Sequence, residues 1–146
     1  MTKQQFYDFA MLTKEDSNLL FENNKLHNST YLGGYVLEAY IKIILIHYDN
    51  PDFKNHLGSY NLSKKLQELF SLYPELFDNS ILIQNNQHYP KNLFNGGGNN
   101  STKASWKSNF RYDINKWSDS SFCEKVQKEL EIIEEELSKL KLDGVI

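Results

Sequence analysis

The chain has 146 residues, of which 40% are apolar, and this suits one domain, residues 1–146, with one hydrophobic core. Its single cysteine, Cys123, excludes an internal disulfide framework, and we expect a cytoplasmic protein because no charged-then-apolar secretory signal is present. The net charge of -3 excludes a general attraction to nucleic acid or anionic membrane, so any such binding would require a local basic patch.

Residues 3–24 carry apolar side chains at helical spacing, in two groups that are separated by a polar gap. Within the gap, Thr13 is followed three residues later by Asp16, which is the pattern of a capping box at a helix start. The segment is therefore expected to form either two short helices or one interrupted helix. His27 falls in the connection that follows and is expected to be a solvated loop residue.

Residues 29–48 are predicted to form the central helix. Their apolar side chains recur at alternating steps of four and three, and further large side chains widen this stripe beyond what one neighbouring helix covers. Asn28 or Ser29 is expected to cap its start, and Asn50 before Pro51 to end it. The stretch is too short for a membrane span and contains charged residues. The stripe consists of Leu32, Val36, Ala39, Ile43 and Ile46.

Two features within this predicted helix bear on function. Gly33 and Gly34 remove two side chains from the helix, which lets another backbone approach closely. Glu38 and Lys42 are four residues apart with the acid first, the favourable order for an ion pair on one helix face. This pair either is solvated at the surface or forms the polar lining of a cleft between helices.

Residues 49–60 have the composition of a turn around His56, which is a general base, a phosphate donor or simply a loop residue. Asn61 or Ser63 starts the next predicted helix, and a proline-led turn over residues 74–77 is expected to continue it. The buried stripe of this helix consists of Leu62, Leu66, Leu69 and Phe70.

Residues 85–101 are predicted to form a long flexible loop, because they are rich in asparagine and glycine and have no apolar stripe to bury. The three consecutive glycines at residues 96–98 lack the lysine and hydroxyl residue that end a phosphate-binding loop, and no predicted strand leads into them. A nucleotide-binding loop is therefore not expected here.

Residues 102–117 are predicted to form an amphipathic helix. Lys103, Lys107 and Arg111 are spaced by four residues and would lie on one face. Between residues 91 and 117 there are five basic residues and one acidic residue, within an acidic protein. The basic face is either a phosphate-binding patch or the solvated side of an anchored helix. The apolar face consists of Trp106, Phe110, Ile114 and Trp117.

Ser118-Asp119 is expected to cap the last predicted helix, which runs to about Lys141 before Gly144 ends it. Its apolar side chains form a heptad seam that either packs inside the bundle or extends into a dimer contact. We expect a homodimer, because the predicted helices have more apolar surface than a small bundle covers. Cys123 is expected to be a core residue. The seam consists of Cys123, Val126, Leu130, Ile133, Leu137 and Leu140.

Four short motifs lie along the chain: Tyr31-Leu-Gly-Gly-Tyr-x-x-Glu38-x-x-x-Lys42, His56-Leu57, Trp106 and Phe110-Arg111-Tyr112. They resemble motifs of the HEPN family, which comprises small all-helical prokaryotic domains. The resemblance spans Met1 to about Leu140, almost the whole chain. Both the predicted elements and the resemblance indicate an all-α, up-and-down four-helix bundle with one or two short additional helices. Many HEPN members are metal-independent ribonucleases, so no cofactor or metal is expected.

The resemblance implies binding or cleavage of RNA, or binding of a nucleotide, in a toxin or defence system with a cognate antitoxin or partner protein. Arg111 would bind a phosphate, Tyr112 would orient it or stack on a base, and His56 would be the general base. Glu38 and Lys42 would support the cleft. The phosphate-binding patch would also include Lys103 and Lys107.

The alternative is a non-catalytic dimeric interaction module or partner subunit, in which Arg111 and Glu38 form an interhelical ion pair. The active HEPN ribonucleases use an arginine that is followed one to two helical turns later by a histidine. This sequence has no histidine at that spacing after Arg111, so the catalytic pair is incomplete and cleavage would need another proton acceptor. The residues at that spacing are Asn115, Lys116 and Trp117.

Overall fold

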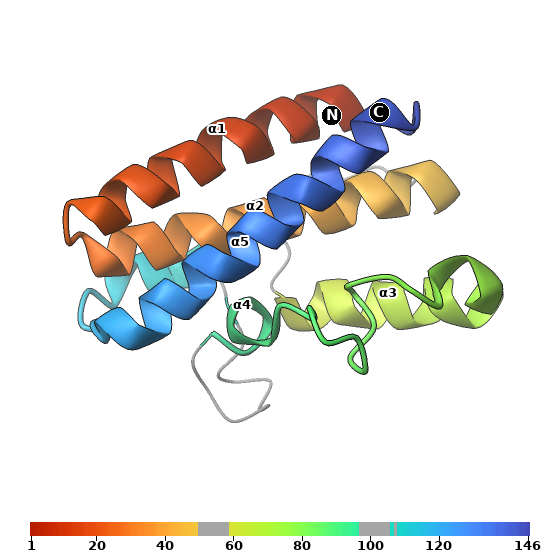
Figure 1. Cartoon of the computed structure of the whole chain (residues 1–146). Coiled ribbons are helices and arrows are strands. Elements are labelled where there is room, and N and C mark those ends of the chain that lie inside the picture. The colour runs from red at the N-terminus through yellow and green to blue at the C-terminus, as the bar shows by residue number, and fades with distance from the viewer. Residues whose placement is uncertain (50–58, 97–105, 107) are drawn as a thin grey trace.

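The computed structural model describes residues 1–49, 59–96, 106 and 108–146, and the regular structure in these ranges is entirely helical (Figure 1). The prediction of an all-α bundle with four main helices is therefore confirmed. The long helices are α1 (Lys3–Glu22), α2 (Leu26–Asp49), α3 (Ser59–Leu72) and α5 (Ser120–Leu142). The short elements are η1 (Pro74–Phe77), α4 (Lys91–Asn95) and η2 (Ser108–Tyr112), of which η1 and η2 are 3-10 helices.

The helices α1 and α2 form an antiparallel hairpin, and α5 packs across both of them (Figure 1). The helix α3 packs on α2, and η1 follows it as the predicted short continuation. Three of the four residues in the predicted α3 stripe are buried, and Phe70 is half-buried. Both chain termini lie at the same end of the bundle (Figure 1).

The first helix is continuous, so the predicted break within residues 3–24 is wrong. The capping box lies at Thr2, whose side chain accepts a hydrogen bond from Gln5 N (3.1 Å), while Gln5 Oε1 accepts one from Thr2 N (2.8 Å). Thr13 lies in the helix interior and is buried. Within the polar gap, Thr13 and Ser17 are buried and Lys14 pairs with Glu134 of α5 (3.6 Å), so tertiary contacts explain its composition.

A buried polar network joins α1, α2 and α5. Ser17 Oγ donates a hydrogen bond to Ser29 O, and Ser29 Oγ donates one to Ser17 O, each at 2.7 Å. Gln127 Nε2 lies 3.0 Å from both hydroxyl oxygens and donates to them. Because buried polar groups need hydrogen-bond partners, this network fixes the register of the three helices.

The central position of α2 is confirmed, since 15 of its 24 residues are buried. By length and hydropathy alone α2 would pass for a membrane span. However, 83% of its most apolar window is buried inside the protein, as in the core helix of a bundle. The wide apolar stripe of α2, which was expected to exceed what one neighbouring helix covers, is covered by other helices of the same chain.

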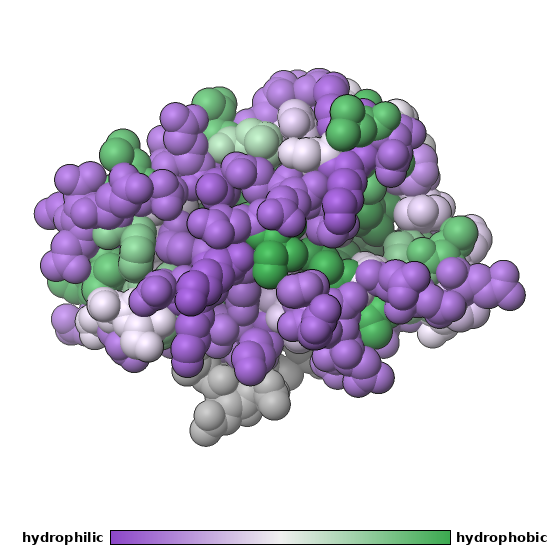
Figure 2. All heavy atoms as spheres, in the orientation of Figure 1, coloured by the Kyte–Doolittle hydropathy of each residue, from purple (hydrophilic) through white to green (hydrophobic). Residues whose placement is uncertain are grey.

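The helix α5 begins and packs as predicted. Asp119 caps it by accepting a hydrogen bond from Ser121 N (3.0 Å), and Gly144 adopts a positive φ of 78° after its end. Five of the six seam residues are 0% exposed, so the seam is intramolecular core. The face of the molecule that α5 occupies is mostly hydrophilic, with hydrophobic residues scattered over it (Figure 2). Cys123 is core, and burial raises the pKa of its thiol.

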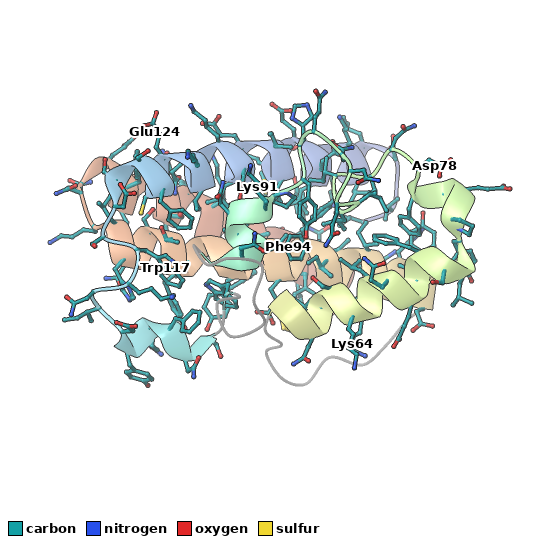
Figure 3. The ribbon with its side chains drawn as sticks, turned by 90° about the horizontal axis from the view of Figure 1, so that it is seen from below. Lys64, Asp78, Lys91, Phe94, Trp117 and Glu124 are labelled. Carbon is teal, nitrogen blue, oxygen red and sulfur yellow. The ribbon has the colours of Figure 1, made fainter. Side chains whose placement is uncertain are left out.

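Part of the predicted loop at residues 85–101 is folded, because α4 lies between α5 and α2 (Figure 3). Glu129 of α5 caps this short helix: Oε2 accepts from Asn92 N (3.1 Å) and Asn92 Nδ2 (3.0 Å), and Oε1 accepts from Leu93 N (2.9 Å). Leu93 and Phe94 are buried. The last residues of the predicted loop lie outside the described ranges.

The predicted helix over residues 102–117 is wrong in its described part, which forms the 3-10 turn η2 followed by further turns. Trp106 and Trp117 are buried as expected, whereas Ile114 is 74% exposed. The physical reason is that the two tryptophans donate hydrogen bonds to different parts of the chain, Tyr31 O and Gly96 O, and one straight helix does not reach both.

Candidate functional site

Trp106 anchors the chain before η2 to the central helix. Its indole is 2% exposed, and its Nε1 donates a hydrogen bond to Tyr31 O (3.2 Å). Gly34 makes room for the ring, because a Cβ atom there would lie 2.0 Å from it. A Cβ atom at Gly33 would meet only side-chain ends, the nearest at 3.2 Å. The sequence suggested that the glycine pair lets another backbone approach closely. In the structure, Gly34 instead makes room for the buried indole of Trp106.

Trp117 anchors the chain after η2. Its indole is buried, and Nε1 donates a hydrogen bond to Gly96 O (2.8 Å). Its backbone has a φ of 60°, a left-handed conformation that is strained for a bulky residue. The ring stacks on His27 with 5.4 Å between centroids, and Phe110 packs edge-on at 5.6 Å. The packing of the indole therefore outweighs the backbone preference at this position.

His27 is half-buried in the first turn of α2, so the prediction of a solvated loop residue is wrong. Its Nδ1 lies 2.9 Å from Lys116 O, and its Nε2 lies 3.4 Å from Arg111 O. The ring also stacks on Tyr31, with 6.5 Å between centroids. His27 therefore ties η2 and the following turn to the start of α2.

Between the two tryptophan anchors, η2 presents an aromatic ring and a cation to solvent. Tyr112 is 80% exposed, and the guanidinium carbon of Arg111 lies 5.7 Å from the centre of its ring. The Lys116 ammonium lies 4.6 Å from the ring centre of Phe110. Lys116 and Trp117 line an open depression of about 300 Å³. We call Arg111, Tyr112 and Lys116 the η2 surface.

A row of polar side chains on α2 continues from this region. Tyr31, Tyr35, Glu38 and Lys42 follow one another at helical spacing, and the hydroxyls of Tyr31 and Tyr35 are 2.6 Å apart. The pKa of Tyr35 is raised, first by burial, then by its hydrogen bond to Tyr31 and by the charge of Glu38, while the Arg111 charge opposes this. Tyr35 therefore lies within electrostatic reach of the η2 surface.

The ion pair predicted between Glu38 and Lys42 is formed, with Lys42 Nζ 2.6 Å from Glu38 Oε1. The two side chains are only 3% and 5% exposed, so the expectation of a solvated pair is wrong. The ammonium of Lys42 also lies 5.4 Å from the ring centre of Phe6 in α1. The pair is thus buried beside α1, in an interior where removing one of the two charges is costly.

The predicted site residues are only partly brought together. Tyr112 and Arg111 lie side by side on η2 and are exposed. The ion pair that the structure describes for Glu38 is with Lys42, whereas Arg111 is exposed and its guanidinium lies over the ring of Tyr112. Three predicted site residues lie outside the described ranges: His56, Lys103 and Lys107.

Sequence reasoning missed Tyr35, His27 and Lys116. Tyr35 had a detectable signal, because it is four residues after Tyr31 and three before Glu38, which puts all three on one helix face. The contact between His27 and Lys116 joins residues 89 positions apart, so no local pattern could have paired them.

Within the described ranges, no three side chains of His, Cys, Asp or Glu are grouped so that they could hold a metal ion. Comparison with known protein families, with curated proteins and with solved structures finds no match for this chain. The HEPN resemblance therefore stays a hypothesis, and the functional argument depends on the geometry.

Proposed function

We propose that this protein binds a single-stranded RNA segment or a nucleotide at the η2 surface. The observation that carries the proposal is Tyr112, a large aromatic side chain that is 80% exposed beside the Arg111 guanidinium. Proteins that bind single-stranded nucleic acid combine such rings, on which bases stack, with cations that pair with phosphates.

Each residue of the η2 surface has a distinct role in this proposal. Tyr112 stacks on a base, an interaction worth about 1–3 kcal/mol. Arg111 donates two parallel hydrogen bonds to a phosphate, and Lys116 adds a second cation. Exposed Asp113 lies between them and leaves a net charge of +1 from two cations and one anion, which favours a short stacked segment over a duplex.

The tryptophan anchors give this surface a defined shape. Trp106 precedes η2 and Trp117 follows it. Both indoles are buried, and each donates a hydrogen bond to a backbone carbonyl elsewhere in the chain. A segment that is already ordered loses less conformational entropy when it binds a ligand. The backbone that carries the exposed ring is therefore positioned before any ligand arrives.

The described residues support recognition better than cleavage. A ribonuclease needs a general base within hydrogen-bond reach of the attacking hydroxyl. His27 contacts the Arg111 backbone, but both of its ring nitrogens face backbone carbonyls. Ribonuclease activity with His56 as the base remains an expectation of the HEPN resemblance.

The test is equilibrium binding of a labelled oligouridine at low salt, followed by fluorescence polarisation, with ATP as a competitor that reveals a nucleotide site. Tyr112→Ala is expected to weaken RNA binding roughly tenfold through loss of one stacked base. Ile114→Ala is the matched control, because this side chain is similarly exposed (74%) but has no ring. Failure of both oligouridine and ATP to bind would contradict the proposal.

A second candidate function, a non-catalytic interaction module, is favoured by the outer face of α1. Phe9, Leu12 and Leu19 are 39%, 65% and 57% exposed, and their spacing puts them on one side of the helix. We infer that this face binds a second copy of the chain, which would form the expected homodimer. The sequence suggested a dimer because the predicted helices have excess apolar surface. In the structure, α2 and the α5 seam are covered within one chain, so the dimer now depends on the α1 face.

A further inference from the structure

We propose that a cavity at the end of the bundle farthest from the η2 surface binds a small organic ammonium ion. The cavity has a volume of about 240 Å³ and is enclosed by the end of α2, by η1 with the turn after it, and by the end of α5. Figure 3 shows the separation of the two regions, since Asp78 beside the cavity and Trp117 beside η2 lie at opposite ends.

The charged groups that line this cavity are all carboxylates. Glu75, Asp78 and Glu136 contribute three negative charges, and no lysine or arginine is among the described residues that line it. His47 also lines it, and burial together with the nearby Lys3 lowers the pKa of this histidine, so it is neutral at pH 7. Two ammonium groups contact the wall, Lys3 at His47 Nδ1 (3.2 Å) and Lys139 at Glu136 Oε1 (3.1 Å), and the three carboxylates outnumber them. The cavity therefore favours a cation over a phosphate.

A buried polar group in the wall supplies a second, independent reason to expect a ligand. Tyr40 lines the cavity and is 4% exposed, and its hydroxyl has no hydrogen-bond partner among the described residues. Burial and the charge of Glu136 raise the pKa of this hydroxyl, so it stays protonated. The side chain is almost entirely buried but its hydroxyl is open to the cavity, where an ammonium N–H group would donate to its oxygen.

One carboxylate remains available for the same cation. Lys139 Nζ donates a hydrogen bond to Glu136 Oε1 (3.1 Å), and Lys139 itself is largely exposed. Oε2 of Glu136 takes no hydrogen bond from the residues that the structure describes. Glu136 and Tyr40 both line the cavity, so one ammonium group could contact the two oxygens together.

The remaining walls suit the apolar part of an organic cation. Tyr48 and Phe77 pack edge-on, 5.1 Å apart, and ring faces attract cations. Ile44 and Leu140 supply aliphatic surface for an alkyl chain. The last turns of α2 and α5 both reach the cavity, and helix C-termini carry partial negative charge. An alkylammonium ion therefore fits better than a hydrated metal ion or a nucleotide.

The test uses three probes of similar size: n-butylammonium, the neutral n-butanol and the anion butyrate. Binding is followed by NMR chemical shifts of the tyrosine ring protons and the backbone amides. Butylammonium is expected to shift signals of residues in the cavity wall at millimolar concentration or below. The other two probes are expected to bind at least about tenfold more weakly, since they lack a charge-assisted hydrogen bond to the wall.

Two variants test the assigned contacts. Glu136→Gln and Tyr40→Phe should each weaken butylammonium binding roughly tenfold, and Tyr40→Phe keeps the ring that fills the core. Glu124→Gln is the matched control, because it removes an exposed carboxylate at the other end of the same helix (Figure 3). Equal binding of butanol and butylammonium, or no binding of either, would overturn the proposal, as would an equal loss of binding in Glu124→Gln.

Discussion

The indole of Trp106 occupies the space that a side chain at Gly34 would need, with only 2.0 Å between the ring and an added Cβ atom. Gly34→Ala must therefore expel the ring from the core. Loss of a buried tryptophan costs roughly 3–5 kcal/mol, and alanine returns about 1 kcal/mol in helix propensity. The net loss of about 2–4 kcal/mol should appear in urea unfolding, with a red-shifted tryptophan emission.

Gly33→Ala is the control for this substitution. Its Cβ atom would meet the ends of the Leu130, Leu93 and Val126 side chains at 3.2–3.3 Å, and such ends adjust more easily than a buried indole. We expect a change in stability below about 1 kcal/mol, since alanine propensity offsets the tighter packing. Equal destabilisation by the two variants would contradict the role assigned to Trp106.

The buried pair of Glu38 and Lys42 predicts a strongly non-additive response. Lys42→Met alone should cost about 3–5 kcal/mol because it breaks a buried ion pair by removing one of its two charges. Combining it with Glu38→Leu should recover most of this loss, since two apolar side chains replace the pair. Urea unfolding of the single and double variants gives the coupling free energy.

The control pair has the same spacing but lies at the surface. Glu124 and Lys128 are also four residues apart, with 3.9 Å between their charged atoms and more than half of each side chain exposed. Removing either of them should change stability by less than about 0.5 kcal/mol. Additive effects of Lys42→Met and Glu38→Leu would show that the buried pair is not coupled.

The cap that Glu129 provides predicts both a loss of stability and a pH effect. Glu129→Gln replaces one acceptor oxygen with an NH₂ group that faces N–H donors, which should cost roughly 1–3 kcal/mol at pH 7. Glu124→Gln, on the same helix but exposed, should change little. Amide exchange within α4 would rise only in the Glu129 variant.

The pH effect follows from the direction of the pKa shift. Burial raises the pKa of Glu129 above its ordinary value, although the hydrogen bonds from Leu93 and Asn92 oppose this. The folded state therefore holds the proton more tightly than the unfolded state, and stability falls as pH rises from the unfolded to the folded pKa. The stability advantage of the wild type over Glu129→Gln should shrink as pH rises through this window. A stability advantage of the wild type that grows as pH rises would contradict the raised pKa of Glu129.

RNA binding at the η2 surface should depend steeply on salt, because each neutralised phosphate releases counterions. Arg111→Gln and Lys116→Gln should each flatten the slope of log Kd against log salt, by roughly 0.7 per phosphate contact on a single strand. Lys64→Gln removes an exposed positive charge on α3 and should leave the slope unchanged.

Arg111→Lys separates shape from charge at the same position. Lysine keeps the positive charge but loses the planar fork that grips a phosphate in two places. We expect weaker binding with a salt slope close to the wild type and an unchanged melting temperature, because Arg111 is exposed. If the variant binds as tightly as the wild type, Arg111 contributes only its charge, and the two-point contact with phosphate is contradicted.

The apolar face of α1 predicts a dimer in solution. Light scattering at micromolar concentration should give twice the 17.1 kDa mass of the chain. Leu12→Glu combined with Leu19→Glu should return the mass to that of a monomer without unfolding it, since both side chains are more than half exposed. A monomer mass for the wild type at all concentrations would remove this second candidate function.

Local sequence patterns were enough to predict several of the helical elements. The stripe of α2, the seam of α5 and the cap at Asp119 were all predicted, because helical periodicity and capping act between residues a few positions apart. Phe110 and Arg111 belonged to a predicted helix for the same reason, and there local spacing was misleading.

The roles of the polar and aromatic residues depend on contacts between distant parts of the chain. Glu129 caps a helix that is 36 residues earlier in the sequence, and Lys116 meets His27 across 89 residues. Trp117 adopts a left-handed backbone because its indole is held by the rest of the fold. These contacts depend on which surfaces the packed helices bring together. A local sequence pattern contains no information about contacts between residues that are far apart in the sequence.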